Sequence, residues 1–179
     1  MEKRLKPALL AVFRSRAQAE GAIEDLLIAG FGEGSVGLVS PEYCLDARRE
    51  VLRYPADAGA GQRAFDRRGV VPGSDWARTA VEERLGWHRT PATVVYIPNV
   101  GPVAALGLFA GVTNGRKWLD GCLAGTDVSP TERTHFESQV EAGKTVVGVL
   151  PEGRAILARE ILQRYGGELS RVRTRGTCW

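Results

Sequence analysis

Few residues of this 179-residue chain have the chemistry of a catalytic group. The chain has two histidines, His88 and His135, and histidine is the side chain best matched to proton transfer near neutral pH. His135 stands beside Phe136 with no neighbour at metal-ligand spacing, which favours a solvated helix position. His88 stands between Trp87 and Arg89, so it is the candidate general acid or base, with a structural histidine as the alternative.

Aromatic residues around His88 indicate a ligand-binding site of a different kind. Three of the four tryptophans fall in the middle of the chain, together with Tyr96. Aromatic side chains combine a large apolar surface with a polar tip, which suits the wall of a pocket. Tryptophans more often fill a core, and that alternative stays open. The predicted pocket lining is Trp76, Trp87, His88, Tyr96 and Trp118.

The three cysteines, Cys44, Cys122 and Cys178, are an odd number without CxxC spacing. This pattern argues against a disulfide framework or a zinc site and favours a reducing compartment. We therefore expect a cytoplasmic protein without a metal or other cofactor. Cys122 follows Arg116 and Lys117 closely, so a reactive thiolate is one hypothesis and a buried, inert thiol is the other.

Several other classes of site have no sequence support. The glycines from Gly101 to Gly125 lack both the GxGxxG spacing and a P-loop. Carboxylates such as Glu132 and Glu137 fall on a predicted helix and are expected to be solvated. A net charge of +3 is too small to imply a nucleic-acid partner. The longest candidate span, 100–113, falls short of the roughly 18 apolar residues that cross a bilayer, so no membrane span is expected.

The elements that must position these residues follow two similar patterns at the two ends of the chain. The first is an apolar strand over 8–13, a helix that Ser15 and Gln18 open as a capping box and Gly30 ends, and a strand over 35–39. The second follows a helix with a capping box at Ser129. It consists of an apolar strand over 145–150, a helix over 155–165 and a strand over 168–174, and Arg171, Arg173 and Arg175 alternate toward its end.

Two such units predict an α+β fold, a ferredoxin-like split βαβ sandwich with a long insertion between its halves. The first half is 1–40, the insertion is 41–128 and the second half is 129–179. In this arrangement the first strand of each half is central and the second strand is an edge. Two helices cover one sheet face, so we expect a homo-oligomer through the other face unless the insertion folds back over it. The central strands offer only Phe13 for base stacking, which argues against RNA recognition.

The insertion contains weaker patterns. Residues 53–73 are polar and lack periodicity, whereas 74–85 predict a helix and 93–97 predict a strand. Residues 101–111 are apolar and rich in small side chains, and 116–124 predict a short helix.

Segments 11–40, 97–107, 121–125 and 143–149, with the capping box at Ser129, resemble the heat-induced, general stress protein family of bacteria. The resemblance implies the split βαβ fold but no reaction, and it carries over no catalytic residue. Asn99 departs from the family pattern, which favours glycine there, and 76–88 looks like an addition. The resemblance covers about two thirds of the chain and omits 42–92.

We therefore expect a non-catalytic, stress-associated or accessory module that acts through self-association or by binding a protein partner. The alternative is a small-molecule-binding protein or enzyme that uses the aromatic pocket, with His88 as its candidate catalytic residue.

Overall fold

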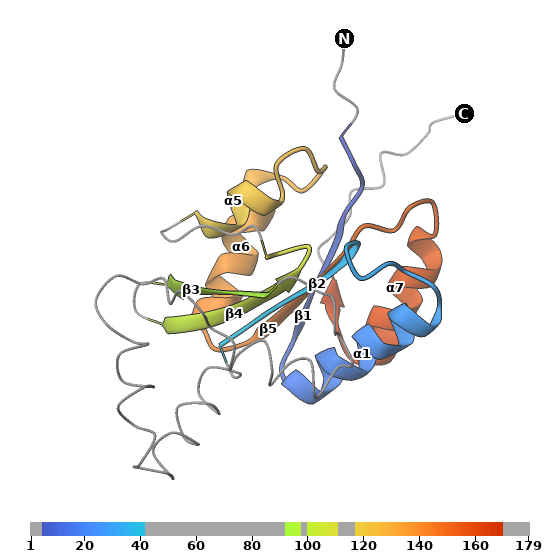
Figure 1. Cartoon of the computed structure of the whole chain (residues 1–179), viewed down its shortest axis with the longest axis horizontal. Helices are drawn as coiled ribbons and strands as arrows, with labels where there is room; N and C mark the ends of the chain where they lie inside the picture. Colours follow the sequence, from blue (N-terminus) through green and yellow to red (C-terminus); the bar gives the residue numbers. More distant parts are fainter. Residues whose placement is uncertain (1–4, 42–91, 98–99, 111–116, 170–179) are drawn as a thin grey trace.

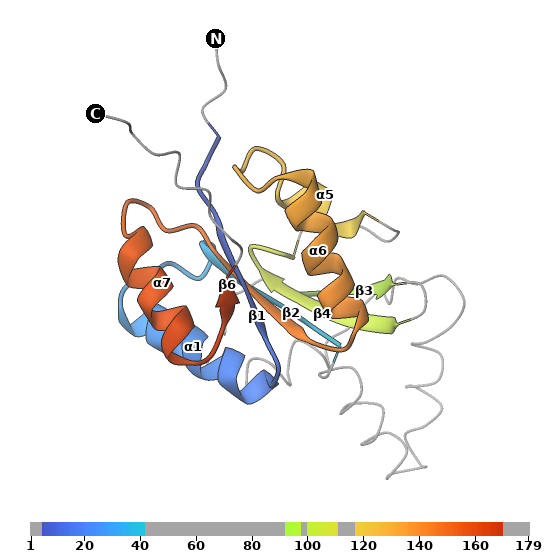
Figure 2. The ribbon, with the colours of Figure 1, turned by 180° about the vertical axis from the view of Figure 1, so that it is seen from behind.

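The computed structural model describes residues 5–41, 92–97, 100–110 and 117–169. In these residues six strands form one antiparallel sheet, in the order β3-β4-β2-β5-β1-β6, with helices on both faces (Figures 1 and 2). The chain is an α+β protein. Among the described helices, none has the length and apolar character that a membrane span needs.

The strands are β1 (Leu9–Phe13), β2 (Val36–Ser40), β3 (Ala92–Ile97), β4 (Gly101–Gly107), β5 (Thr145–Val149) and β6 (Glu168–Leu169). The helices are α1 (Arg16–Ile28), α5 (Trp118–Cys122), α6 (Pro130–Glu141) and α7 (Ala155–Arg164).

The two apolar strands lie inside the sheet, as predicted. β1 pairs with β5 from Leu9 opposite Val149 to Phe13 opposite Thr145, and each strand has a second neighbour on its other side. Every residue of both strands is buried. A strand covered on both faces needs apolar side chains at consecutive positions, which explains the unbroken apolar runs.

The prediction that the strand after α1 forms an edge is wrong. β2 pairs with β5 on one side and with β4 on the other. The insertion supplies β4 and the predicted strand β3, which form a hairpin and extend the sheet beyond β2. β4 was not predicted because its glycines and alanines give little of the alternation that marks a strand.

One sheet face is covered by α1 and α7 (Figure 1). The two helices approach closely at Gly21, where a Cβ atom would lie 2.6 Å from the Tyr165 ring. Arg154 fastens the C-terminal end of α1, because its guanidinium donates to the carbonyl oxygens of Ala29 (2.8 Å) and Gly30 (3.0 Å). The same group lies 4.1 Å above the centre of the Phe31 ring. Positive charge at this end of a helix complements its dipole.

The opposite face, which was expected to be bare, is covered by α5 and α6 (Figure 2). Phe109 packs onto it over Gly37 and Gly148, which are opposite each other in β2 and β5. A Cβ atom would lie 2.8 Å from this ring at Gly37 and 2.5 Å from it at Gly148, so the ring would have to move if either position carried a side chain. The insertion supplies α5 and Phe109, as the exception anticipated from the sequence, whereas α6 belongs to the second half. Pairing of copies through a bare face therefore loses its premise.

Two capping boxes were predicted, at Ser15 and at Ser129, and the structure contains one of them. The box at Ser129 is confirmed: its hydroxyl accepts from the Glu132 amide, and the Glu132 carboxylate accepts from the Ser129 amide. Ser15 does occupy the N-cap of α1, but its side chain makes no capping hydrogen bond. The expected box with Gln18 is therefore wrong, and the Gln18 amide lies instead beside Gly166. Gly30 has the left-handed conformation expected after α1, with φ of 85°.

Some predictions lie outside the described residues. They include the helix over 74–85, the polar stretch 53–73 and the end of the last strand with Arg171, Arg173 and Arg175.

Candidate functional site

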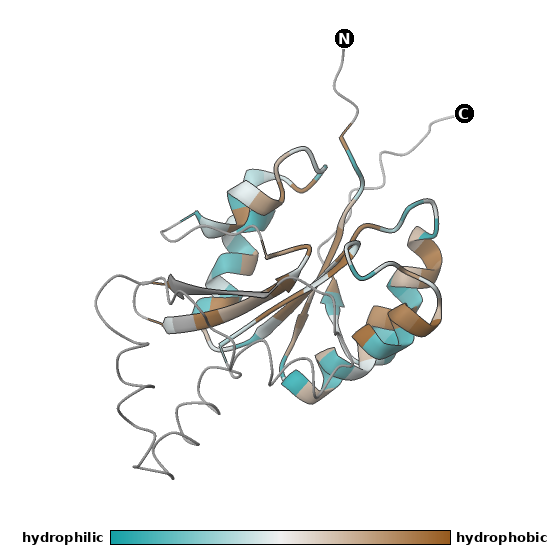
Figure 3. Cartoon of the chain, viewed as in Figure 1, coloured by the Kyte–Doolittle hydropathy of each residue, from teal (hydrophilic) through white to brown (hydrophobic). Residues whose placement is uncertain are grey.

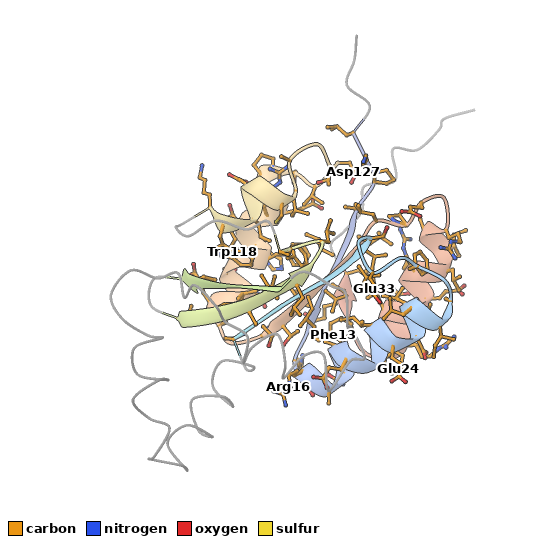
Figure 4. All side chains as sticks on the ribbon, in the orientation of Figure 1. Phe13, Arg16, Glu24, Glu33, Trp118 and Asp127 are labelled. Atoms are coloured by element: carbon orange, nitrogen blue, oxygen red, sulfur yellow. The ribbon has the colours of Figure 1, made fainter. Side chains whose placement is uncertain are left out.

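Two of the five residues predicted to line the aromatic pocket lie in the described part of the chain. Trp118 begins α5 and is 1% exposed, between the helices and the sheet (Figure 4). Tyr96 lies in β3, opposite Pro102 of β4. Trp76, Trp87 and the candidate catalytic residue His88 lie outside the described residues. The burial of Trp118 agrees with the alternative that this tryptophan fills the core and does not line a pocket.

Trp118 nevertheless has an unusual polar group. Its indole N–H is buried and has no hydrogen-bond partner, and it is the only such side-chain atom found in the described part of the chain. Leaving a buried donor unpaired costs about 1–3 kcal/mol. A bound acceptor would remove that cost, so this nitrogen is the one described feature that favours a ligand.

Cys122 lacks the properties of a nucleophile. Burial raises the pKa of its thiol to about 11, and hydrogen bonds from the backbone amides of Cys122 and Leu123, with the charge of Arg133, oppose this shift only in part. The thiol donates to the carbonyl oxygen of Leu119 at 3.3 Å. With a pKa near 11, only about one thiol in ten thousand is ionised at pH 7. The geometry therefore favours the inert alternative.

Glu137 was expected to be solvated, but it is 6% exposed. Its carboxylate accepts the Leu119 amide at 3.0 Å and so holds the first turn of α5. Burial raises the pKa of this carboxyl, and the negative charges of Asp120 and Glu141 raise it further. Sequence reasoning missed Glu137, although its position three residues before the buried Val140 is a helical signal for the same face.

Arg133 completes this connection between α5 and α6. Its guanidinium donates to the carbonyl oxygens of Val128 and Leu123, each at 3.2 Å, and to the Asp120 carboxylate at 3.3 Å. These polar groups all hold the helices in place. His135 is exposed on α6, as predicted, with its ring at an edge-on angle of 74° to Phe136. The described residues contain no cluster of three or more His, Cys, Asp or Glu side chains that could hold a metal.

The sheet has two ends, and they differ in character. β6 is two residues long and lies beside the exposed ion pair of Arg14 with Glu168 (3.4 Å). Short edge strands and charges are the usual protection against unwanted strand pairing. β3 is six residues long, from Ala92 to Ile97, and contains no charged residue. It pairs with β4 along its whole length and, within the described residues, with no other strand.

The hydrogen bonds of β2 establish which backbone groups of β4 face β3. Leu150 donates to the Ser35 carbonyl at 2.7 Å, and Leu108 donates to the Val36 carbonyl at 3.0 Å. Backbone groups of alternate residues in an antiparallel strand point to opposite neighbours. Because the Val36 carbonyl points to β4, the backbone groups of all even-numbered residues of β2 point to β4. Their partners in β4 are also even-numbered, so the backbone groups of those partners point back to β2.

The same alternation then applies to β3. Odd-numbered residues of β4 point toward β3, where they are paired with Thr93, Val95 and Ile97. The N–H and C=O groups of the remaining three residues, Ala92, Val94 and Tyr96, therefore point away from β4. We call this outer side of β3, with its three outward residues, the β3 edge.

Comparison with known proteins identifies no relative: no family model, no curated protein and no solved structure matches the chain.

Proposed function

We propose that this chain is a non-catalytic accessory module that acts by self-association or by binding a protein partner through the β3 edge. The observation that carries the proposal is the set of outward backbone groups on an uncharged edge strand. Such an edge binds an extended strand by continuing the backbone ladder of the sheet.

The two sheet faces offer little room for another mode of binding. The helices α1 and α7 pack on one face and α5 and α6 on the other, and the strands β1, β2 and β5 are buried throughout. In Figure 3 hydrophilic and hydrophobic residues alternate along α1 and α7, as is typical of helices with one face on a core. An edge remains accessible to a partner even where both faces of a sheet are covered.

The described polar side chains also favour a binding role over catalysis. Glu137 and Arg133 are engaged in joining α5 to α6, and the Cys122 thiol is protonated at neutral pH. A catalytic acid or base must lie within reach of its substrate, and the pKa of the catalytic group itself must suit the working pH.

The proposal includes the finer fold assignment. The order β6-β1-β5-β2, with α1 between β1 and β2 and α7 between β5 and β6, supports a ferredoxin-like split βαβ sandwich. The β3–β4 hairpin then belongs to the insertion. An experimental structure in which β6 paired next to β2 would contradict this assignment. The resemblance to bacterial stress proteins supports a role under stress, which protein abundance after heat shock of the native host would test.

Amide hydrogen exchange in dilute solution tests whether the edge is available. The amides of Ala92, Val94 and Tyr96 should exchange close to the rate of an unstructured chain, while those of Thr93 and Val95 should be protected by β4. Protection of all five amides in a dilute monomer would mean that the chain closes its own edge, and the proposal would be wrong.

The unpaired indole N–H of Trp118 favours a second candidate, a small-molecule-binding protein. Native mass spectrometry of freshly purified protein should then detect a stoichiometric mass that disappears on denaturation. The chain mass alone, under conditions that preserve a known weak complex, would contradict this candidate.

A further inference from the structure

We propose that the partner of the β3 edge is the β3 edge of a second copy, paired antiparallel about a twofold axis at Val94. This inference rests on the proposed function and adds the identity of the partner and the register of the contact.

The positions of the outward groups favour a symmetric pair. Ala92 and Tyr96 lie two residues on either side of Val94, so the three outward residues are symmetric about it. In an antiparallel ladder, outward residues must be opposite outward residues. The register centred on Val94 places Ala92 opposite Tyr96 of the second copy and Val94 opposite its own equivalent. All three outward residues of each copy are then paired.

This register uses the edge fully. Each hydrogen-bonded pair in an antiparallel ladder exchanges two N–H···O bonds, so three pairs give about six bonds. A shift by two residues in either direction leaves one outward residue of each copy unpaired. A shift by one residue places outward groups against inward ones and makes no ladder. The strand therefore specifies its own register.

Charge also favours a second copy. A twofold axis at Val94 places only the residues nearest the axis beside their own equivalents, so a charged residue there would lie close to a like charge. β3 has no charged residue between Ala92 and Ile97 and therefore has no such penalty. At the other end of the sheet, the described part of β6 carries the charged Glu168. The contact would join the two sheets into one, with β3 and its equivalent at the centre.

A proline substitution at one outward position tests the inference. Val94→Pro removes an outward N–H and leaves the hydrogen bonds of Thr93 and Val95 to β4 in place, because proline is tolerated at an edge whose N–H faces outward. Val94→Ala shortens the same side chain but keeps the N–H, and it is the matched control. Sedimentation from sub-micromolar to hundreds of micromolar protein should detect a monomer–dimer equilibrium for wild type and Val94→Ala. Val94→Pro should weaken dimerisation at least tenfold.

Hydrogen exchange on the wild-type protein provides a second readout that does not depend on a variant. The amides of Ala92, Val94 and Tyr96 should gain protection as the protein concentration rises through the dimerisation range, while those of Thr93 and Val95 should be protected throughout. If Val94→Pro does not fold, this alternating dependence on concentration decides the question.

Three results would overturn the inference. A wild-type protein that stays monomeric at every concentration, with freely exchanging outward amides, would exclude the second copy but leave the edge available to another partner. A dimer that Val94→Pro leaves intact would place the contact elsewhere. Outward amides that are protected in the dilute monomer would overturn both this inference and the proposed function.

Discussion

A methyl group at position 148 would collide with Phe109, and the cost of that collision tests how the second sheet face is packed. The added Cβ of Gly148→Ala would lie 2.5 Å from Cζ of Phe109 and 3.1 Å from Cδ2 of Leu10. Carbon atoms prefer separations of about 3.5–4.0 Å, so the ring must move. Overpacking of this kind costs about 1–3 kcal/mol. Alanine gains back about 0.5–1 kcal/mol by restricting the unfolded chain.

Taken at the midpoints of these ranges, the expected net loss is about 1 kcal/mol in the free energy of unfolding, measured by urea titration. For a chain of this size a loss of about 1 kcal/mol lowers Tm by about 2–4 °C. Gly34→Ala is the control, because a Cβ at Gly34 has no atom within 4 Å. In a Phe109→Leu background, Gly148→Ala should cost less by about 0.5–3 kcal/mol, since the colliding ring atoms are gone. Equal stability of Gly148→Ala and Gly34→Ala, or no relief by Phe109→Leu, would refute the packing described for this face.

Three further substitutions have defined outcomes. The pKa of Glu137 is raised in the folded protein, so folding favours the protonated carboxyl. The stability that the protonated carboxyl contributes is lost as pH rises through the raised pKa. Glu137→Gln, which cannot ionise, should therefore be more stable than wild type at pH 7. This advantage should shrink as pH falls toward 4.5, and a constant difference in thermal melts across this range would contradict it. Arg154→Met should lower the free energy of unfolding by about 2 kcal/mol, because it removes two hydrogen bonds to α1 and the contact with Phe31; a neutral effect in urea titration would contradict the fastening role. With Cys44 and Cys178 replaced by serine, Cys122 should react with a disulfide reagent at least tenfold more slowly in the folded than in the unfolded protein, and equal rates would contradict its burial.

The inner strands and the long helices could be predicted because their signals are local. β1 and β5 are unbroken apolar runs, and α6 begins at a complete capping box. Edge positions depend on which other strands join the sheet, so the prediction for β2 failed once β4 joined it. The small residues of β4 gave no alternation, so the strand that displaces β2 from the edge had no local signal.

The candidate site was harder to predict because its groups belong to the backbone. Sequence reasoning ranks side chains by their chemistry, and it selected Trp118 and Cys122, both of which are packed inside the α5–α6 layer. It treated Glu137 as solvated because a single charge on a helix usually is, whereas a contact with the amide of Leu119 stabilises it in the interior. The outward groups of Val94 and its neighbours follow from the strand order, which no local pattern specifies.

Residue-resolved hydrogen exchange across β3 at two protein concentrations tests the central claim most directly. At low concentration, Thr93 and Val95 should be protected while Ala92, Val94 and Tyr96 exchange freely; at high concentration all five should be protected. This alternation would support both a free edge and its pairing with a second copy. Uniform protection at low concentration would contradict the free edge, and free exchange of the three outward amides at high concentration would contradict self-pairing.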